Sequence, residues 1–194
     1  MNDMAQFLPL WGFIVMMVAT PGPANLLLMS AGAQQGFART TPFIAGLITG
    51  KLLLNVALAL GLIRLLPEDS PLGTLFMLLS AAYMAYLALR NWTPGTSNQN
   101  QKDFTFLNGI IVHPLSPKTW VMTTLALTQF GSSFDSPAQQ LVVVPLSFLA
   151  AQLFFHSLWC LSGAALNRVF KQSLLMHRAL ILLTLLVILW AVSQ

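Results

Sequence analysis

Two prolines that flank a glycine interrupt the first apolar stretch of this chain. The stretch runs from about Phe7 to Ala33, and a bilayer span takes about 20 mostly apolar residues. Pro21, Gly22 and Pro23 lie near its middle. Each proline removes a backbone donor and clashes with the preceding turn, so a regular helix cannot continue through them. Because irregular backbone in a membrane must be buried in protein or line a wet cavity, we expect a broken membrane helix beside a polar cavity.

The composition supports a membrane setting. Of the 194 residues 56% are hydrophobic and 7% charged, whereas soluble domains carry roughly 25% charged residues. The net charge of +4 comes from basic residues that cluster in short loops, which membrane topology explains better than nucleic-acid binding. Cys160 is the single cysteine, so no disulfide framework is expected. The first apolar stretch is too long for a signal-peptide core, and we expect it to be a retained span.

The pattern of apolar stretches predicts an all-α integral membrane protein in which residues 1–194 form one transporter domain. The expected spans are Phe7–Ala33, Phe43–Leu66, Leu72–Leu89, Phe104–Leu127, Leu141–Leu166 and Met176–Val192. A polar linker over residues 91–103 separates two halves, about 1–90 and 104–194. With three spans per half, the second half enters the membrane from the opposite side, which predicts two inverted three-helix repeats.

The loops also predict an orientation. Basic residues concentrate in the odd-numbered loops, which we therefore place in the cytoplasm, with both termini outside. These basic residues are Arg39, Arg90, Lys102, Arg168, Lys171 and Arg178.

The fourth span carries an interruption that matches the first. It reads His113-Pro114-Leu115-Ser116-Pro117-Lys118. Paired proline interruptions in corresponding spans point to the binding site of a secondary transporter. We expect broken helices 1 and 4 to meet near the midplane, with alternating access rocking the halves about these two breaks.

Lys51 and Lys118 are the charged residues well inside the predicted spans. A lysine at the bilayer centre costs about 2.5–3.5 kcal/mol, so each is a functional candidate. Lys118 follows Pro117, where a second half-helix would begin, and an ammonium at a helix N-terminus suits a carboxylate. The alternative is that Lys118 snorkels or donates to carbonyls freed by the break.

Lys51 follows Gly46 and Gly50, whose spacing lets helices approach closely, either within the chain or in a homodimer. Its ammonium either points into the interior or snorkels to the interface. Asn55, one turn later, would share the cavity with Lys51 or bond across helices.

The remaining polar candidates are neutral or titratable. Asn25 and Ser116 would bond either the substrate or freed backbone. His113 and His156 are the embedded groups that titrate near neutral pH, which makes them proton-coupling candidates; the alternative for each is an interhelical hydrogen bond. The chain lacks the HExxH and GxSxG motifs and any acidic cluster, so we expect no enzyme, no metal and no cofactor.

Two motifs resemble the signatures of the LysE/RhtB family of amino-acid exporters, of the homoserine/threonine and cysteine/O-acetylserine efflux type. Thr20-Pro21-Gly22-Pro23-Ala24-Asn25, followed by small residues to Gly36 and then Gly46, resembles the opening signature. Ser116-Pro117-Lys118, followed by Gln129-Phe130, resembles the second, which usually has Asn-Pro-Lys and a later Gln-Phe. The size, span count and polar linker match as well, so the resemblance covers essentially the whole chain.

The resemblance implies secondary-active, proton-coupled efflux of amino acids or their derivatives across the bacterial inner membrane. The chain departs from the family at Ser116, which replaces the usual Asn, and at Lys51, where an acidic residue is common. With Lys51 in place of an acidic residue, the chain lacks a carboxylate there that could bind a proton or the ammonium of a cargo. We therefore expect a neutral or acidic rather than a basic cargo. The expected substrate-binding residues are Pro21, Gly22, Pro23, Asn25, Lys51, Asn55, His113, Ser116, Pro117 and Lys118.

Two alternatives stay open. The same scaffold could export another small anion or cation, and two buried lysines favour an anion. The chain could also be a non-transporting membrane subunit or an intramembrane enzyme. The missing catalytic motifs argue against the enzyme, and the matched breaks argue against the subunit. The expected partners are a small-molecule substrate and the lipid bilayer, with no nucleic acid.

Overall fold

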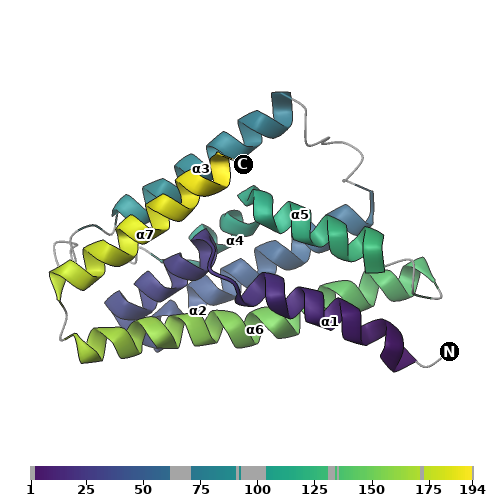
Figure 1. The fold of residues 1–194 in the computed structure, drawn as a ribbon, viewed down its shortest axis with the longest axis horizontal. Coiled ribbons are helices and arrows are strands. Elements are labelled where there is room, and N and C mark those ends of the chain that lie inside the picture. The colour runs from purple at the N-terminus through teal and green to yellow at the C-terminus, as the bar shows by residue number, and fades with distance from the viewer. Residues whose placement is uncertain are drawn as a thin grey trace.

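The computed structural model (Figure 1) describes residues 3–61, 71–90, 92, 104–130, 134, 136–170 and 173–193, and helices form nearly all of these residues. None of these residues forms a strand. The elements are α1 (Asp3–Ala19), α2 (Pro23–Ala59), α3 (Pro71–Arg90), α4 (Phe106–Leu115), α5 (Pro117–Leu125), the π-helical turn η2 (Ala126–Phe130), α6 (Pro137–Val169) and α7 (Leu174–Val192).

The first helix break lies where the sequence predicts it. α1 ends at Ala19 and α2 begins at Pro23, so residues 20–22 are not helical. Gly22 is extended, with φ −157° and ψ 168°. Pro23 takes the first position of α2, where a helix has no use for the missing N–H.

The second break divides the fourth predicted span. α4 ends at Leu115, Ser116 is extended with φ −84° and ψ 117°, and Pro117 begins α5. Pro114 is accommodated within α4, and His113, which the sequence places in the interruption, is helical in the last turn of α4. The break is therefore confined to Ser116 and is narrower than the sequence suggests.

α2 contains a turn inside the loop that the sequence predicts between the first two spans, at residues 34–42. Gly36 has φ +75° and ψ 171°, a left-handed conformation that favours glycine. The chain turns back there, which divides α2 into segments of residues 23–35 and 37–59 (Figure 1). The first segment completes the first predicted span after α1. The second span therefore begins near residue 37 rather than Phe43, and residues 62–66 of its predicted end lie outside the described part.

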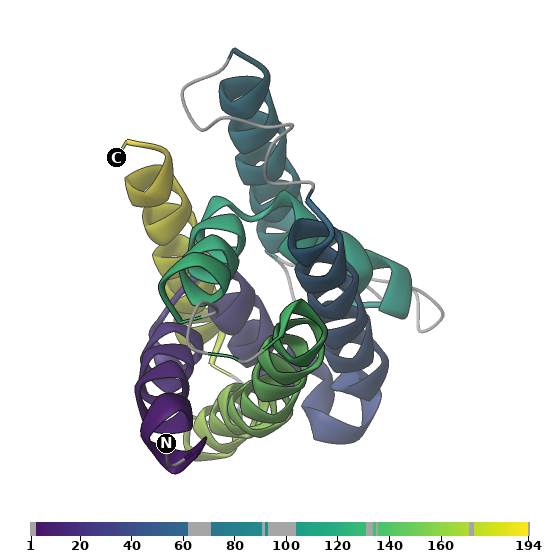
Figure 2. The same cartoon turned by 90° about the vertical axis from the view of Figure 1, so that its right-hand side faces the viewer.

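The elements pack along one long axis. α2 makes its most extensive contacts with α6 and α4, and α3 lies beside α7 (Figure 1). Figure 2 shows α1, α5 and α6 around the axis, viewed from one end of the molecule. Helices at Pro23–Ala59 and Ala138–Val169 are long and apolar enough to cross a membrane, and the length of the first includes the Gly36 turn. Large apolar side chains on the outer faces are exposed, as lipid contact requires; they include Leu78, Leu153, Phe154, Leu175 and Leu186.

Glycines allow two pairs of segments to touch through their backbones. A Cβ added at Gly46 or Gly50 would overlap the carbonyls of Phe106 or Ile110 on α4, and one added at Gly109 would approach Phe43 on α2. Gly46 and Gly50 therefore make an internal contact with α4. Their spacing is then no longer a reason to expect a homodimer.

A second pair of glycines joins α2 to α6. A Cβ added at Gly32 would overlap the carbonyl of Cys160, and one added at Gly163 would overlap that of Met29. The two segments of α2 are thus each fixed by close glycine contacts, one to α6 and one to α4.

We predict that Gly50→Ala destabilises the protein by about 1–3 kcal/mol, because overpacking of a tight contact forces backbones apart. Gly12→Ala is the matched control, since nothing lies within 4 Å of a Cβ added there. Thermal unfolding of the two purified variants in detergent measures the difference. Equal stability of the two variants would contradict the close α2–α4 contact.

Candidate functional site

The two helix breaks meet at Lys118. Its Nζ donates to the hydroxyl Oγ1 of Thr20 at 2.8 Å and lies 3.5 Å from the Thr20 carbonyl oxygen. A Cβ added at Gly22 would lie 3.4 Å from the same Nζ. Residues 98 positions apart in the chain are therefore joined at the point where each helix is interrupted.

Side chains pair the carbonyls released at the end of α1. The last four carbonyls of a helix lack partners within it, and inside a membrane each needs another donor. Asn25 Nδ2 donates to the carbonyls of Val18 and Thr20, at 2.9 Å each. The Thr20 hydroxyl donates to Met17 at 3.1 Å, and Trp159 Nε1 donates to Ala19 at 3.3 Å. The amide nitrogen of Asn25 is thus engaged with freed backbone, the structural one of its two predicted roles.

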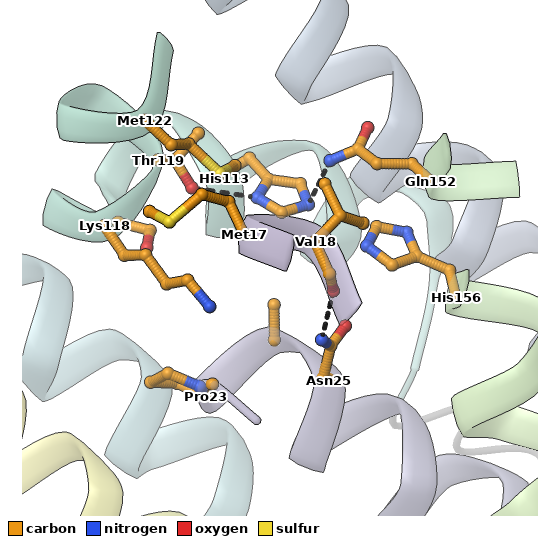
Figure 3. Close-up of a pocket in the computed structure, with 13 residues that line it drawn as sticks. Met17, Val18, Pro23, Asn25, His113, Lys118, Thr119, Met122, Gln152 and His156 are labelled. Carbon is orange, nitrogen blue, oxygen red and sulfur yellow. Dashed lines mark hydrogen bonds between the residues drawn. The ribbon is translucent and has the colours of Figure 1, made fainter. Parts of the chain in front are cut away.

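A pocket lies between the breaks (Figure 3). It has about 350 Å³ of empty space, its open mouth included. Residues of α1, α2, α4, α5 and α6, with Gly22 and Ser116 of the two breaks, line it: Met17, Val18, Gly22, Pro23, Ala24, Asn25, His113, Ser116, Lys118, Thr119, Met122, Gln152 and His156. Among these lining residues Lys118 provides the ammonium group.

The pocket brings together most of the predicted site residues. Gly22, Pro23, Asn25, His113, Ser116, Lys118 and His156 line it. Pro21 is exposed and Pro117 lines a neighbouring hollow between α5, α3 and α7. Lys51 and Asn55 do not line the pocket.

A pair of stacked histidines forms one wall. The rings of His113 and His156 are 5.4 Å apart and nearly parallel, at 11°. His113 Nδ1 lies 3.1 Å from Thr119 Oγ1, and its Nε2 lies 3.2 Å from Gln152 Nε2 (Figure 3). With the Gln152 amide in this orientation, its nitrogen donates to His113 Nε2, which corresponds to the tautomer with the ring proton on Nδ1.

Lys51 lies in a second polar cluster, directly behind the pocket. Its side chain is 1% exposed, and Nζ donates to Thr123 Oγ1 and to the Thr119 carbonyl. The ammonium also lies 4.0 Å from the ring centroid of Phe148, a cation–π contact. Asn55 accepts a hydrogen bond from Thr123 at 2.9 Å, and its own Nδ2 is buried without a partner. Lys51 therefore points into the interior, as one of the two predictions had it.

Thr119 connects the two clusters. Its hydroxyl contacts His113 at the pocket, and its carbonyl accepts from Lys51 behind it. Thr119, Thr123 and Gln152 were not predicted from the sequence. Gln152 had a detectable signal, since it is an amide inside an apolar stretch one turn before His156 and so shares its face of the helix.

The matched motifs, the two breaks and the pocket between them agree with a comparison to known families. A profile described as LysE type translocator matches residues 15–193. This chain belongs to the LysE type translocator family. The match includes both breaks and every residue that lines the pocket. The protein is accordingly a membrane translocator.

Curated relatives of this LysE type translocator share one description. Cysteine/O-acetylserine efflux proteins of Escherichia coli strain HS, Shigella flexneri serotype 5b and Shigella sonnei strain Ss046 are each 28% identical to it over 168 residues. The similarity covers 84% of this chain and 84% of each relative. No solved structure matches the translocator significantly.

We predict that Lys51→Met leaves the folded translocator at least as stable as the wild type. The groups described around Nζ are neutral, and replacing a buried charge with an apolar side chain of similar volume is often neutral or stabilising. Thr123 keeps hydrogen-bond distance to Asn55 and to the Thr119 carbonyl without the lysine. Thermal unfolding in detergent is the measurement, with Leu47→Met, at a buried position one turn earlier, as control. A large loss of stability confined to Lys51→Met would show that the lysine holds α2 against α5.

Proposed function

We propose that this translocator is a secondary-active exporter of neutral or acidic amino acids or amino-acid derivatives across the bacterial inner membrane, driven by exchange with protons. The observation that carries the proposal is the Lys118 ammonium, which lies in the pocket at the junction of both helix breaks and is paired with neutral Thr20. The efflux proteins to which the chain is similar are named for cysteine and O-acetylserine, both small neutral amino acids.

Two helix N-termini reinforce the charge of Lys118. α2 begins at Pro23 and α5 at Pro117, and neither has a side-chain cap on its first turn. The residues before them, Gly22 and Ser116, both line the pocket. Helix N-termini carry partial positive charge, and half-helices in transporters present them to anionic substrate groups. A carboxylate bound here would replace Thr20 as the partner of Lys118.

The proposed architecture is six spans in two inverted halves. α1 with residues 23–35 would form the first span, and α4 with α5 and η2 the fourth, each broken at a proline. Rocking of one half against the other would alternately expose the pocket to the two sides of the membrane, with both chain termini outside.

His113 and His156 are the proposed proton carriers. They stack on each other in the pocket wall and are both buried. Lys118 of α5 lines the same pocket as His113, Lys51 of α2 contacts Thr119, whose hydroxyl faces His113, and His156 of α6 stacks on the His113 ring. A proton on either ring would therefore add positive charge to a site that already holds two lysines, and we propose that it enters as cargo leaves.

A second candidate is the export of another small organic or inorganic anion. Lys51 and Lys118, both surrounded by neutral groups in the described part of the chain, favour it. A comparison of the compounds that leave overexpressing cells, and of those that become less toxic, separates the two candidates.

We predict that Lys118→Met abolishes efflux of amino acids from overexpressing cells, because the carboxylate loses its counter-charge. Lys118→Arg keeps the positive charge and should retain measurable efflux. Extracellular amino acids are quantified by mass spectrometry, with immunoblots to confirm equal membrane levels. Unchanged efflux by Lys118→Met would contradict the carboxylate site.

We predict that a reporter fused after Gln194 lies outside the cytoplasm, because basic residues place the odd-numbered loops inside. Paired alkaline phosphatase and fluorescent protein fusions measure this, since the first is active outside and the second inside. A cytoplasmic C-terminus would contradict both the orientation and the inverted repeat.

A further inference from the structure

Two buried acceptor-type atoms in the pocket have no partner. They are Gln152 Oε1 and His156 Nδ1, one helical turn apart on α6, on side chains that are 1% and 2% exposed. Both residues line the pocket and lie across it from Lys118 (Figure 3). A buried polar group without a partner costs free energy that a bound donor can recover. The proposed carboxylate site at Lys118 does not account for these two atoms.

The neighbours of Gln152 determine which of its atoms is available. Its nitrogen donates to His113 Nε2, and Thr119 holds the other nitrogen of that ring. With its nitrogen on His113 Nε2, the amide leaves Oε1 as the unpaired atom, and a carbonyl oxygen can only accept. His156 Nδ1 can also accept when the ring proton is on Nε2. This side of the pocket therefore suits a group with several N–H donors, such as a primary ammonium.

The positive charge at the pocket favours an ammonium group whose molecule also carries a carboxylate. Lys118 lies in the pocket, so a simple amine would be repelled by its like charge. A carboxylate without an amine would pair with Lys118 but leave Gln152 and His156 unsatisfied. A zwitterion satisfies both ends, because its own carboxylate lies between its ammonium and Lys118.

We propose that Gln152 and His156 bind the α-ammonium group of a zwitterionic amino acid whose carboxylate is bound at Lys118. The inference rests on the proposed export function and deepens it: the site selects cargo with both a free α-amino group and a free carboxylate. Met17, Val18 and Met122 line the same pocket and would face the cargo side chain. Methionine adapts its shape readily, which suits small apolar or thiol side chains of differing form.

The test compares molecules that share the thiol side chain of cysteine but lack either its amino group or its carboxylate. The purified full-length protein is reconstituted in liposomes, and counterflow of radiolabelled L-cysteine is measured under reducing conditions. The unlabelled competitors are L-cysteine, 3-mercaptopropionate, which lacks the amino group, and cysteamine, which lacks the carboxylate. For the wild type, each half-molecule should compete about tenfold or more weakly than cysteine, because one end of the site stays unpaired.

Variants of the protein test which residues bind the ammonium group of the cargo and which bind its carboxylate. Gln152→Leu and His156→Leu should each raise the KM for cysteine about tenfold or more without weakening competition by 3-mercaptopropionate. Lys118→Met should abolish labelled-cysteine counterflow, because the carboxylate loses its partner. Gln152→Glu keeps an acceptor at this position and should retain cysteine exchange, which guards against a leucine variant that fails to fold. Ser162→Ala is the matched control on α6, since that hydroxyl bonds its own helix at Leu158.

The outcomes separate this inference from the proposed function. If 3-mercaptopropionate competes as well as cysteine in the wild type, or if Gln152→Leu weakens both competitors equally, the ammonium site is overturned while amino-acid export stands. If the wild type exchanges no cysteine and overexpressing cells release no amino acid, the proposed function is overturned, and this inference with it.

Discussion

The hydrogen bond between Lys118 and Thr20 joins two helix breaks that a membrane would otherwise not tolerate. Broken helices release carbonyls and amides, and lipid offers them no partner. At the end of α1 the released carbonyls are paired by Asn25 of α2, Trp159 of α6 and Thr20 of the break itself. At the second break the indole of Trp120 donates to the Pro114 carbonyl at 2.6 Å. Each break therefore depends on tertiary contacts, and the pocket exists because both breaks are placed together.

The polar residues of the site divide into two groups by what they contact. Asn25 and Trp159 are engaged with backbone, so they maintain the break. Gln152 and His156 present unpaired atoms, and Lys118 is paired with the neutral hydroxyl and carbonyl of Thr20; these three are the residues that we propose bind cargo. Lys51 belongs to neither group. It is connected to the pocket through Thr119, whose carbonyl accepts from Lys51 and whose hydroxyl contacts His113 in the pocket wall.

Packing on the two sides of the pocket differs in kind. Towards the Gly36 turn, backbones touch through Gly32 and Gly163 and through Gly50 and Gly109. Towards the N-terminus of α1, aromatic rings fill the space instead, with Phe7 against Phe134 and Phe13 against Phe130 at ring centroid distances of 5.8 and 5.3 Å. Close-packed backbones transmit motion as rigid units, whereas side chains can change rotamer.

The sequence alone determined the membrane setting, the two breaks and the candidacy of Lys118, because proline chemistry and the cost of a charge in an apolar stretch act locally along the chain. It placed a loop over residues 34–42 between the first two spans, but it did not show that Gly36 alone makes the turn while the residues on both sides stay helical. Nor did it separate the roles of Asn25 and Lys51, since each had two partners available in principle. Only the tertiary structure decided these, by bringing Val18 to Asn25, Thr123 to Lys51 and the unpaired oxygen of Gln152 to the pocket. Hydrogen bonds between residues distant in sequence depend on packing that no local pattern encodes.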